Sequence, residues 1–318
     1  MRAITDFVGS LNLPDALAQE LAGAPILAQH ALYVQLPAWL APVFGLPRDA
    51  ASVEQLGVSS YFYFRFLLVL DNLLDTAPPS SAGATAQNGA SPVAPHLAAR
   101  RLLTYCNLFE HAVRGLSGLF PAADPFWAEL DACKKQYAAS VLEEKARNAA
   151  RGPFPLTRFV ALAAGKSAVC NAIVHALSRL GSDGWAAGTP LLACLADLHV
   201  ALQCMDDVED FVRDAEQGQY TYAHALVEAY LRRNGVDATG LSPEQLHPYL
   251  YTSGTAVGLY ALAQEQFTRA LVLIRPFPLE ELSDYLHHLS GRCAHYSADI
   301  EAGLARGRER VRRAEEAA

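Results

Sequence analysis

The sequence has no excess of positive charge: its 318 residues include 25 Lys and Arg against 33 Asp and Glu, a formal net charge of -8. Proteins that bind nucleic acids normally present a basic face to the phosphates. The composition therefore argues against a nucleic-acid partner. With 52% hydrophobic and 18% charged residues, the chain has the composition of a globular protein and not of a disordered one.

The chain lacks any C-x-x-C pair and any His/Cys cluster at zinc spacing. Its cysteines stand far apart, mostly inside apolar stretches, so we interpret them as reduced core thiols and predict a cytoplasmic protein. They are Cys106, Cys133, Cys170, Cys194, Cys204 and Cys293.

Long hydrophobic runs are also missing. The most apolar run, 61–74, contains Arg65 and Asp71 and is shorter than the roughly 20 residues that span a bilayer. The amino terminus shows no apolar segment followed by a small-residue cleavage site. We predict no integral membrane segment and no secretory signal.

No stretch of alternating β-branched residues is long enough to support a sheet. Helical patterns dominate instead, with Pro and Gly clusters between them. They predict an all-α fold: a single domain over 1–318, a bundle of long antiparallel helices around a central cavity. The expected helices are 53–76, 97–119, 124–149, 156–180, 187–217, 243–274 and 279–312.

One irregular stretch, 76–96, is rich in Pro, Ala, Ser and Gly. A loop of this length inside a compact domain is either a functional lid or a disordered insertion, and its composition does not separate the two. We expect a flexible loop at the mouth of the site that the preceding acidic residues form.

The first acidic motif ends the helix before this loop. Asp71 and Asp75 are one turn apart and project from the same face, where the carboxyl-terminal helix dipole adds negative charge. Phe64 and Leu67 lie further back on the same side. The alternative is a solvated surface pair formed by chance; otherwise the two carboxylates need a cation.

The second motif repeats this arrangement. Asp206, Asp210 and Asp214 follow one another at intervals of four residues, a line along one helix. His199 and Leu202 precede them on an apolar stripe. A solvated acidic face is again the alternative. Two helices that each end an apolar stripe in carboxylates favour Mg²⁺, which prefers oxygen ligands and is readily completed by phosphate oxygens.

A net-acidic protein needs placed cations as well as metal ions to hold a polyanion. The best candidate is Lys166, because an ammonium in an otherwise apolar helix is costly unless it meets an anion. Its alternative is to extend to the surface. Arg158 and Arg292, the latter close to Tyr296, are further candidates.

Over roughly residues 60–222 the chain resembles the class I isoprenoid synthase superfamily, in particular the trans-prenyltransferases. The resemblance rests on Lys166-Ser167, followed by a Gln203-x-x-Asp206-Asp207-x-x-Asp210 stretch. It implies that Lys166 and Gln203 face a diphosphate and that Asp206 and Asp210 hold Mg²⁺. Asp214 joins them if the line is read as a cyclase metal triad. We expect three Mg²⁺ ions and a homodimer.

The departures from the family pattern concern basic residues. No arginine follows Asp75 before Arg100, no Lys or Arg occurs between Arg2 and Arg48, and Gln219 replaces the Lys of a Gly-Lys pair. In the family such residues bind isopentenyl diphosphate. The sequence therefore indicates a metal site for one allylic diphosphate.

We predict a class I terpene synthase that ionises an allylic prenyl diphosphate, C15 or C20, to a hydrocarbon or alcohol plus diphosphate. Asp71, Asp75, Asp206 and Asp210 are the predicted catalytic metal ligands. Phe64, Leu67, His199 and Leu202 are expected to line the cavity. The alternatives are an isoprenyl diphosphate synthase, a head-to-head squalene/phytoene synthase-like prenyltransferase, and a catalytically inactive regulatory homologue.

Overall fold

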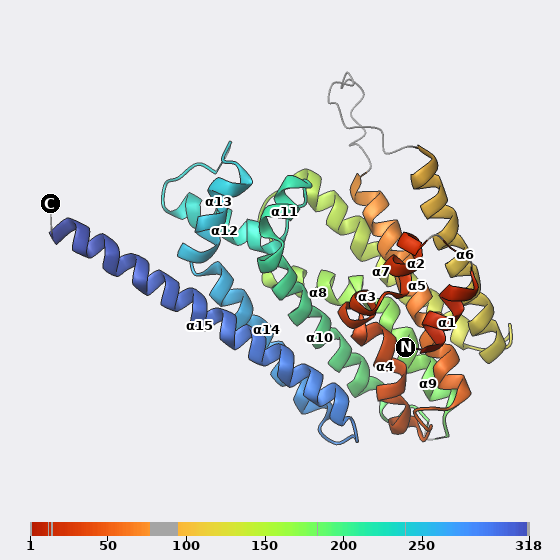
Figure 1. The fold of residues 1–318 in the computed structure, drawn as a ribbon. Coiled ribbons are helices and arrows are strands. Elements are labelled where there is room, and N and C mark those ends of the chain that lie inside the picture. The colour runs from red at the N-terminus through yellow and green to blue at the C-terminus, as the bar shows by residue number, and fades with distance from the viewer. Residues whose placement is uncertain are drawn as a thin grey trace. The chain divides into compact units, whose positions relative to one another are not determined.

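The computed structural model describes residues 2–11, 13, 15–76, 95–182, 184–238 and 240–316, without the side chains of residues 2, 3 and 72–101. Every regular element in these residues is a helix, which confirms the all-α fold class (Figure 1). Two compact units form: Met1–Ala128 with His175–Gly184, and Glu129–Val174 with Trp185–Ala318. The single domain over 1–318 and its central cavity stay predictions. The expected loop 76–96 lies almost wholly outside the described residues.

The first unit is built on the long helix α5 (Ala51–Thr76), which packs against α4 (Ala31–Leu40) and α6 (Pro95–Leu119). At the α5/α6 contact, a Cβ on Gly115 would lie 2.2 Å from the Ser59 hydroxyl oxygen. Only glycine permits so close an approach. The other helices of this unit are α1 (Arg2–Ser10), α2 (Asp15–Ala22), α3 (Ala24–Gln29), the 3₁₀ helix η1 (Ala41–Phe44), the start of α7 and the end of α9.

A buried charge explains why the apolar run of α5 contains an arginine. Arg65 is 7% exposed, and its guanidinium donates to the Glu20 carbonyl oxygen at 3.0 Å and to the Tyr105 hydroxyl at 3.1 Å. Nε2 of His30 lies 3.0 Å from it. Burial and the Arg65 charge lower the pKa of His30 to about 4, so His30 is neutral and accepts the hydrogen bond. This network ties the short amino-terminal helices to α5.

The second unit is organised around α10 (Gly188–Glu209), which packs against α8 (Leu156–Lys166) and α14 (Thr255–Ile274). Buried leucines of α10 and α15, with Phe267 of α14, fill the core. The other elements are α7 (Phe126–Ala150), η2 (Ala168–Cys170), α9 (Asn171–Leu180), α11 (Phe211–Glu216), α12 (Tyr222–Arg233), α13 (Pro243–Thr252) and α15 (Glu280–Glu316), with α7 and α9 shared between the units.

Three predicted helices are interrupted, and the predicted ranges do not include the helices α1–α4 and α12. The 156–180 helix breaks after Lys166, the 187–217 helix breaks at Asp210, and the 243–274 helix breaks at Gly254. Gly254 has φ 79°, a left-handed conformation that glycine adopts without steric cost. The break at Asp210 matters most, because it falls inside the second acidic motif.

One helix of the described residues, α10, is long and apolar enough to cross a membrane, and α8 with Ala168–Leu180 would qualify only as a pair bent by 48°. In α10, 56% of the qualifying stretch is buried inside the protein, as in the core helix of many soluble proteins. The absence of an integral membrane segment stays a prediction.

Helix α15 extends well past its partner α14 (Figure 1). It has 37 residues against 20 in α14, and a helix rises about 1.5 Å per residue. Its last turns are exposed, with 58% of Val311 accessible.

Candidate active site

The second acidic motif lies where α10 gives way to α11. Helix α10 ends at Glu209, and Asp210 leaves helical geometry with φ -103° and ψ 6°. The backbone bonds from the Asp210 amide to the Asp206 carbonyl (2.8 Å) and from the Asp214 amide to the Asp210 carbonyl (2.9 Å) nevertheless persist. The predicted line of three aspartates is therefore kept turn by turn, although it is not part of one helix.

These aspartates raise one another's pKa values. Burial raises the pKa of Asp206 to about 7, and the charges of Asp207 and Asp210 add to the rise. Burial likewise raises the pKa of Asp214 to about 7, again with Asp207 and Asp210 contributing. The Asp206 side chain is exposed, so solvent weakens the burial effect there, whereas repulsion between the neighbouring carboxylates remains. Arg213 forms an ion pair with Asp210 and its charge lowers the pKa of Asp214 in part, so the negative charge of the cluster is only partly balanced.

The chemistry of this cluster fits a hard divalent cation, because it offers carboxylate oxygens whose mutual repulsion a cation relieves. In the part of the chain that the structure describes, however, no three His, Cys, Asp or Glu side chains are already arranged to hold a metal ion. Asp71 is half-buried near the end of α5 in the first unit, and the Asp75 side chain is outside the described set. The assignment of Asp71, Asp75, Asp206, Asp210 and Asp214 as metal ligands stays a prediction.

Asp207 has a structural role that the sequence analysis did not assign. It is 1% exposed; Oδ1 accepts a hydrogen bond from Gln203 Nε2 at 2.8 Å, and Oδ2 accepts one from the Ala223 amide at 3.2 Å. Burial raises its pKa to about 6, although these two hydrogen bonds favour the ionised form. Asp207 thus ties α10 to the first turn of α12. Gln203, predicted to face a diphosphate, points to Asp207.

Lys166 meets an anion, as its place in an apolar helix requires. Helices α7 and α8 approach closely where a Cβ on Gly165 would lie 2.0 Å from the Ser140 hydroxyl. One turn along α7 from Ser140, the Glu144 carboxylate lies 2.7 Å from Lys166 Nζ. The Lys166 charge also offsets part of the rise in the pKa values of Asp206 and Asp207. Contact between Lys166 and a diphosphate stays a prediction.

A small pocket opens beside this pair, with a volume of about 30 Å³, comparable to one or two water molecules. The rings of Phe159 and Tyr222 stack in its wall with centroids 4.6 Å apart. The guanidinium of Arg147, which is 9% exposed, lies 3.7 Å from the Phe154 ring centre. The lining consists of Glu144, Arg147, Phe154, Phe159, Leu162, Ala163, Lys166, Gln203, Asp207, Tyr220, Thr221 and Tyr222.

The other basic candidates also contact carboxylates of the chain. Arg158 pairs with Glu143. Arg292 lies 3.3 Å from Glu209, and its guanidinium faces the ring of Tyr296 at 5.6 Å. The sequence could not supply these pairs, because the partners are distant along the chain.

The predicted cavity residues have varied surroundings. His199 is buried, its Nδ1 lies 2.7 Å from the Leu195 carbonyl oxygen, and burial lowers its pKa to about 4. It is therefore a neutral core histidine. Phe64 stacks on Tyr33 with ring centroids 3.8 Å apart. Leu67 and Leu202 are half-buried. Their contact with substrate stays a prediction.

The sequence matches no protein-family model and no curated protein. The structure, in contrast, is similar to a decaprenyl diphosphate synthase from Rhodobacter capsulatus, with a TM-score of 0.66 and 15% identity over 92% of this chain and 96% of that one. It is also similar to a polyprenyl synthase from Caulobacter crescentus complexed with calcium and isoprenyl diphosphate, with a TM-score of 0.66 and 18% identity over 91% and 94% of the two chains.

A geranylgeranyl pyrophosphate synthase from Lactobacillus brevis gives a TM-score of 0.66 at 16% identity, over 92% of this chain and 94% of that one. At such low identity these likenesses define the fold. The chain has the all-α fold of trans-prenyltransferase-like class I isoprenoid synthases, as the resemblance predicted.

Proposed function

We propose that this chain binds an allylic prenyl diphosphate through Mg²⁺ at the carboxylates of α10 and α11, ionises it, and transfers the allyl group to a second isoprenoid diphosphate. The observation that carries the proposal is the crowded carboxylate cluster of Asp206, Asp210 and Asp214, which Arg213 and Lys166 balance only in part. It lies on the fold of isoprenyl diphosphate synthases, one of which was solved with calcium and isoprenyl diphosphate.

In this mechanism Asp206 and Asp210 are the residues of the second unit that would hold the metal. Bound Mg²⁺ would serve as a Lewis acid that neutralises the diphosphate. Lys166 would donate hydrogen bonds to a diphosphate oxygen. When the bond between C1 and oxygen breaks, the electron pair stays on the leaving oxygen, where the Lys166 charge stabilises it. The remaining allyl cation is the electrophile.

A terpene synthase is the second candidate, and the scarcity of available cations favours it. In the described part of the second unit, Lys166, Arg158 and Arg292 each contact a carboxylate of the chain, while Arg147 in the pocket wall lies over the ring of Phe154. Upstream, the sequence has no Lys or Arg between Arg2 and Arg48. A second diphosphate would therefore find few positive charges, and the cation would instead cyclise, lose a proton or add water.

The two functions are separated by incubating the chain with C10, C15 and C20 allylic diphosphates and Mg²⁺, with and without isopentenyl diphosphate, followed by extraction and mass analysis. A longer diphosphate formed only with isopentenyl diphosphate supports chain elongation. A hydrocarbon or alcohol from the allylic diphosphate alone supports the terpene synthase. Absence of both turnover and Mg²⁺-dependent diphosphate binding contradicts both and favours the inactive homologue.

We propose a C15 or C20 substrate. The homodimer, the cytoplasmic location and the number of Mg²⁺ ions stay predictions.

A further inference from the structure

Two successive glutamates of α7 contact the two cations of α8. Glu143 pairs with Arg158, and Glu144 pairs with Lys166 at 2.7 Å. The two pairs differ in burial: both side chains of the Glu144–Lys166 pair are 24% exposed, against 47% for Arg158 and 39% for Glu143. A charge removed from the half-buried pair is therefore felt more strongly by its neighbours than one removed at the surface.

Lys166 is shared between carboxylates on two sides. Glu144 contacts it from α7, while its charge also acts on Asp206 and Asp207 of α10. Glu144, Lys166 and Asp207 line the same pocket. Arg147 lines this pocket as well, but the ammonium of Lys166 is already in contact with Glu144, so an incoming anion does not meet a vacant cation.

A diphosphate that reaches Lys166 must compete with Glu144. Once displaced, the Glu144 carboxylate would remain half-buried beside a highly charged anion, which is unfavourable. A diphosphate whose charge is reduced by bound metal ions suffers far less from this repulsion. The arrangement therefore opposes bare anions more than metal-bound ones.

We propose that Glu144 is a specificity-determining residue: it competes for Lys166 and thereby restricts the site to diphosphate that arrives with its metal ions. The inference rests on the proposed function, because it concerns the same diphosphate site. It assigns to Glu144 of α7 the selection against metal-free diphosphate, which the two aspartate motifs do not provide.

The test is isothermal titration of the full chain with inorganic diphosphate, once with EDTA and once with excess Mg²⁺. In Glu144→Gln, we expect metal-free affinity to rise by about tenfold and Mg²⁺-loaded affinity to rise by no more than about threefold. The preference for metal-bound diphosphate should therefore shrink. Lys166→Gln removes the competition, so that adding Glu144→Gln to it should raise metal-free affinity less than Glu144→Gln does in the unaltered chain.

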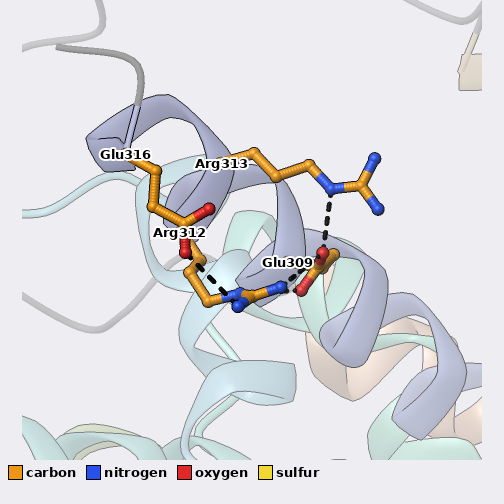
Figure 2. A network of polar contacts seen from close by, with 4 residues as sticks. All are labelled: Glu309, Arg312, Arg313 and Glu316. Atoms are coloured by element: carbon orange, nitrogen blue, oxygen red, sulfur yellow. Dashed lines mark hydrogen bonds and ion pairs between the residues drawn. The ribbon is translucent and has the colours of Figure 1, made fainter.

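The matched control is Glu309→Gln on α15. Figure 2 shows the Glu309 carboxylate in contact with both Arg312 and Arg313. The nitrogen–oxygen distances are 2.9 Å to Arg312 and 2.8 Å to Arg313. This substitution alters the net charge of the same unit by the same amount, and it also removes a carboxylate from arginine contacts. We expect both diphosphate affinities to remain within about twofold, because these side chains are exposed and lie some 17 residues further along α15 than Arg292, which contacts Glu209.

The competing explanation is that Glu144 merely positions Lys166, and it predicts weaker binding in Glu144→Gln. Weaker or unchanged metal-free binding overturns the inference, as does an equal gain in the Lys166→Gln background. Circular dichroism checks folding, and Glu144→Ala provides a second variant with the same charge change. If the unaltered chain binds no diphosphate with Mg²⁺, the proposed function fails too; if it binds but the metal preference survives Glu144→Gln, only the inference fails.

Discussion

Two carboxylate–cation networks in the second unit use the same chemistry in different surroundings. Glu144 and Asp207 line the pocket with Lys166, the Lys166 charge also acts on the exposed Asp206, and the Glu144–Lys166 contact is three-quarters buried. On α15, Glu309 contacts both Arg312 and Arg313, whose side chains are 63% and 74% exposed, and Glu316 contacts Arg312 (Figure 2). The first network has more negative than positive charge, whereas the second is balanced and solvated.

Because of this difference, we expect the two networks to contribute differently to stability and to ligand binding. Exposed pairs at i, i+3 and i, i+4 contribute a few tenths of a kcal/mol to a helix and are screened by salt. A partly buried network with surplus negative charge costs stability until a cation arrives. We therefore expect substitutions in the pocket to alter metal and diphosphate binding, and those on α15 to alter little.

The largest effect is expected for Asp206→Ala. Loss of a metal-binding carboxylate should lower turnover of an allylic diphosphate by about a thousandfold or more, with the circular dichroism spectrum unchanged because the side chain is exposed. Mass analysis of extracted products provides the measurement. Normal turnover would remove Asp206 from the metal site and, with it, the main argument for the pocket network.

Asp207→Leu is expected to act on stability. It leaves the Ala223 amide and the Gln203 side chain without their buried acceptor, and such losses cost about 1–3 kcal/mol. Urea unfolding of this variant should show a lower midpoint than that of the unaltered chain. The comparison variant is Asp206→Asn. Because it relieves the repulsion between neighbouring carboxylates, its urea midpoint should equal or exceed that of the unaltered chain. Equal midpoints for Asp207→Leu and the unaltered chain would contradict the assigned role of Asp207.

The melting temperature should respond to Mg²⁺ in a pH-dependent way. Asp206 and Asp214 have pKa values raised to about 7 in the folded chain, so their contribution to stability is present below their ordinary value of 3.8 and is lost as pH rises through 7. Mg²⁺ binds the ionised carboxylates and should restore it. The rise in melting temperature on adding Mg²⁺ is therefore expected to be larger near pH 8 than near pH 5.

The buried histidines His199 and His224 also make stability depend on pH. The melting temperatures with and without Mg²⁺ must therefore be compared at each pH. Burial lowers both pKa values to about 4, so the stability that depends on their neutral forms is present above 6.5 and declines as pH falls towards 4. That loss is the same with and without Mg²⁺. A Mg²⁺ effect of equal size at both pH values would contradict the raised carboxylate pKa values.

The smallest effect is expected on α15. Glu309→Gln should leave the free energy of unfolding nearly unchanged, and added salt should make any difference smaller still. Chemical denaturation at low and high salt measures this. A loss of several kcal/mol would mean that the solvated network is not the weak member of the comparison.

The long helices could be predicted from the sequence, because α5, α6, α7 and α15 follow continuous apolar periodicity. The breaks could not, because periodicity continues across Asp210 and Gly254 while the backbone does not. The Gln203–Asp207 contact had a signal, since residues four apart in a helix face one another. Glu144 had none: it meets Lys166 only because Gly165 and Ser140 let α7 and α8 approach closely.

The central claim is Mg²⁺-dependent ionisation of an allylic diphosphate at Asp206. Its most direct test is the release of inorganic diphosphate from C15 and C20 allylic diphosphates by the unaltered chain and by Asp206→Ala. We predict release that needs Mg²⁺, stops with EDTA and is lost in the variant. Release that persists with EDTA or in Asp206→Ala, or no release from either substrate, would contradict the account.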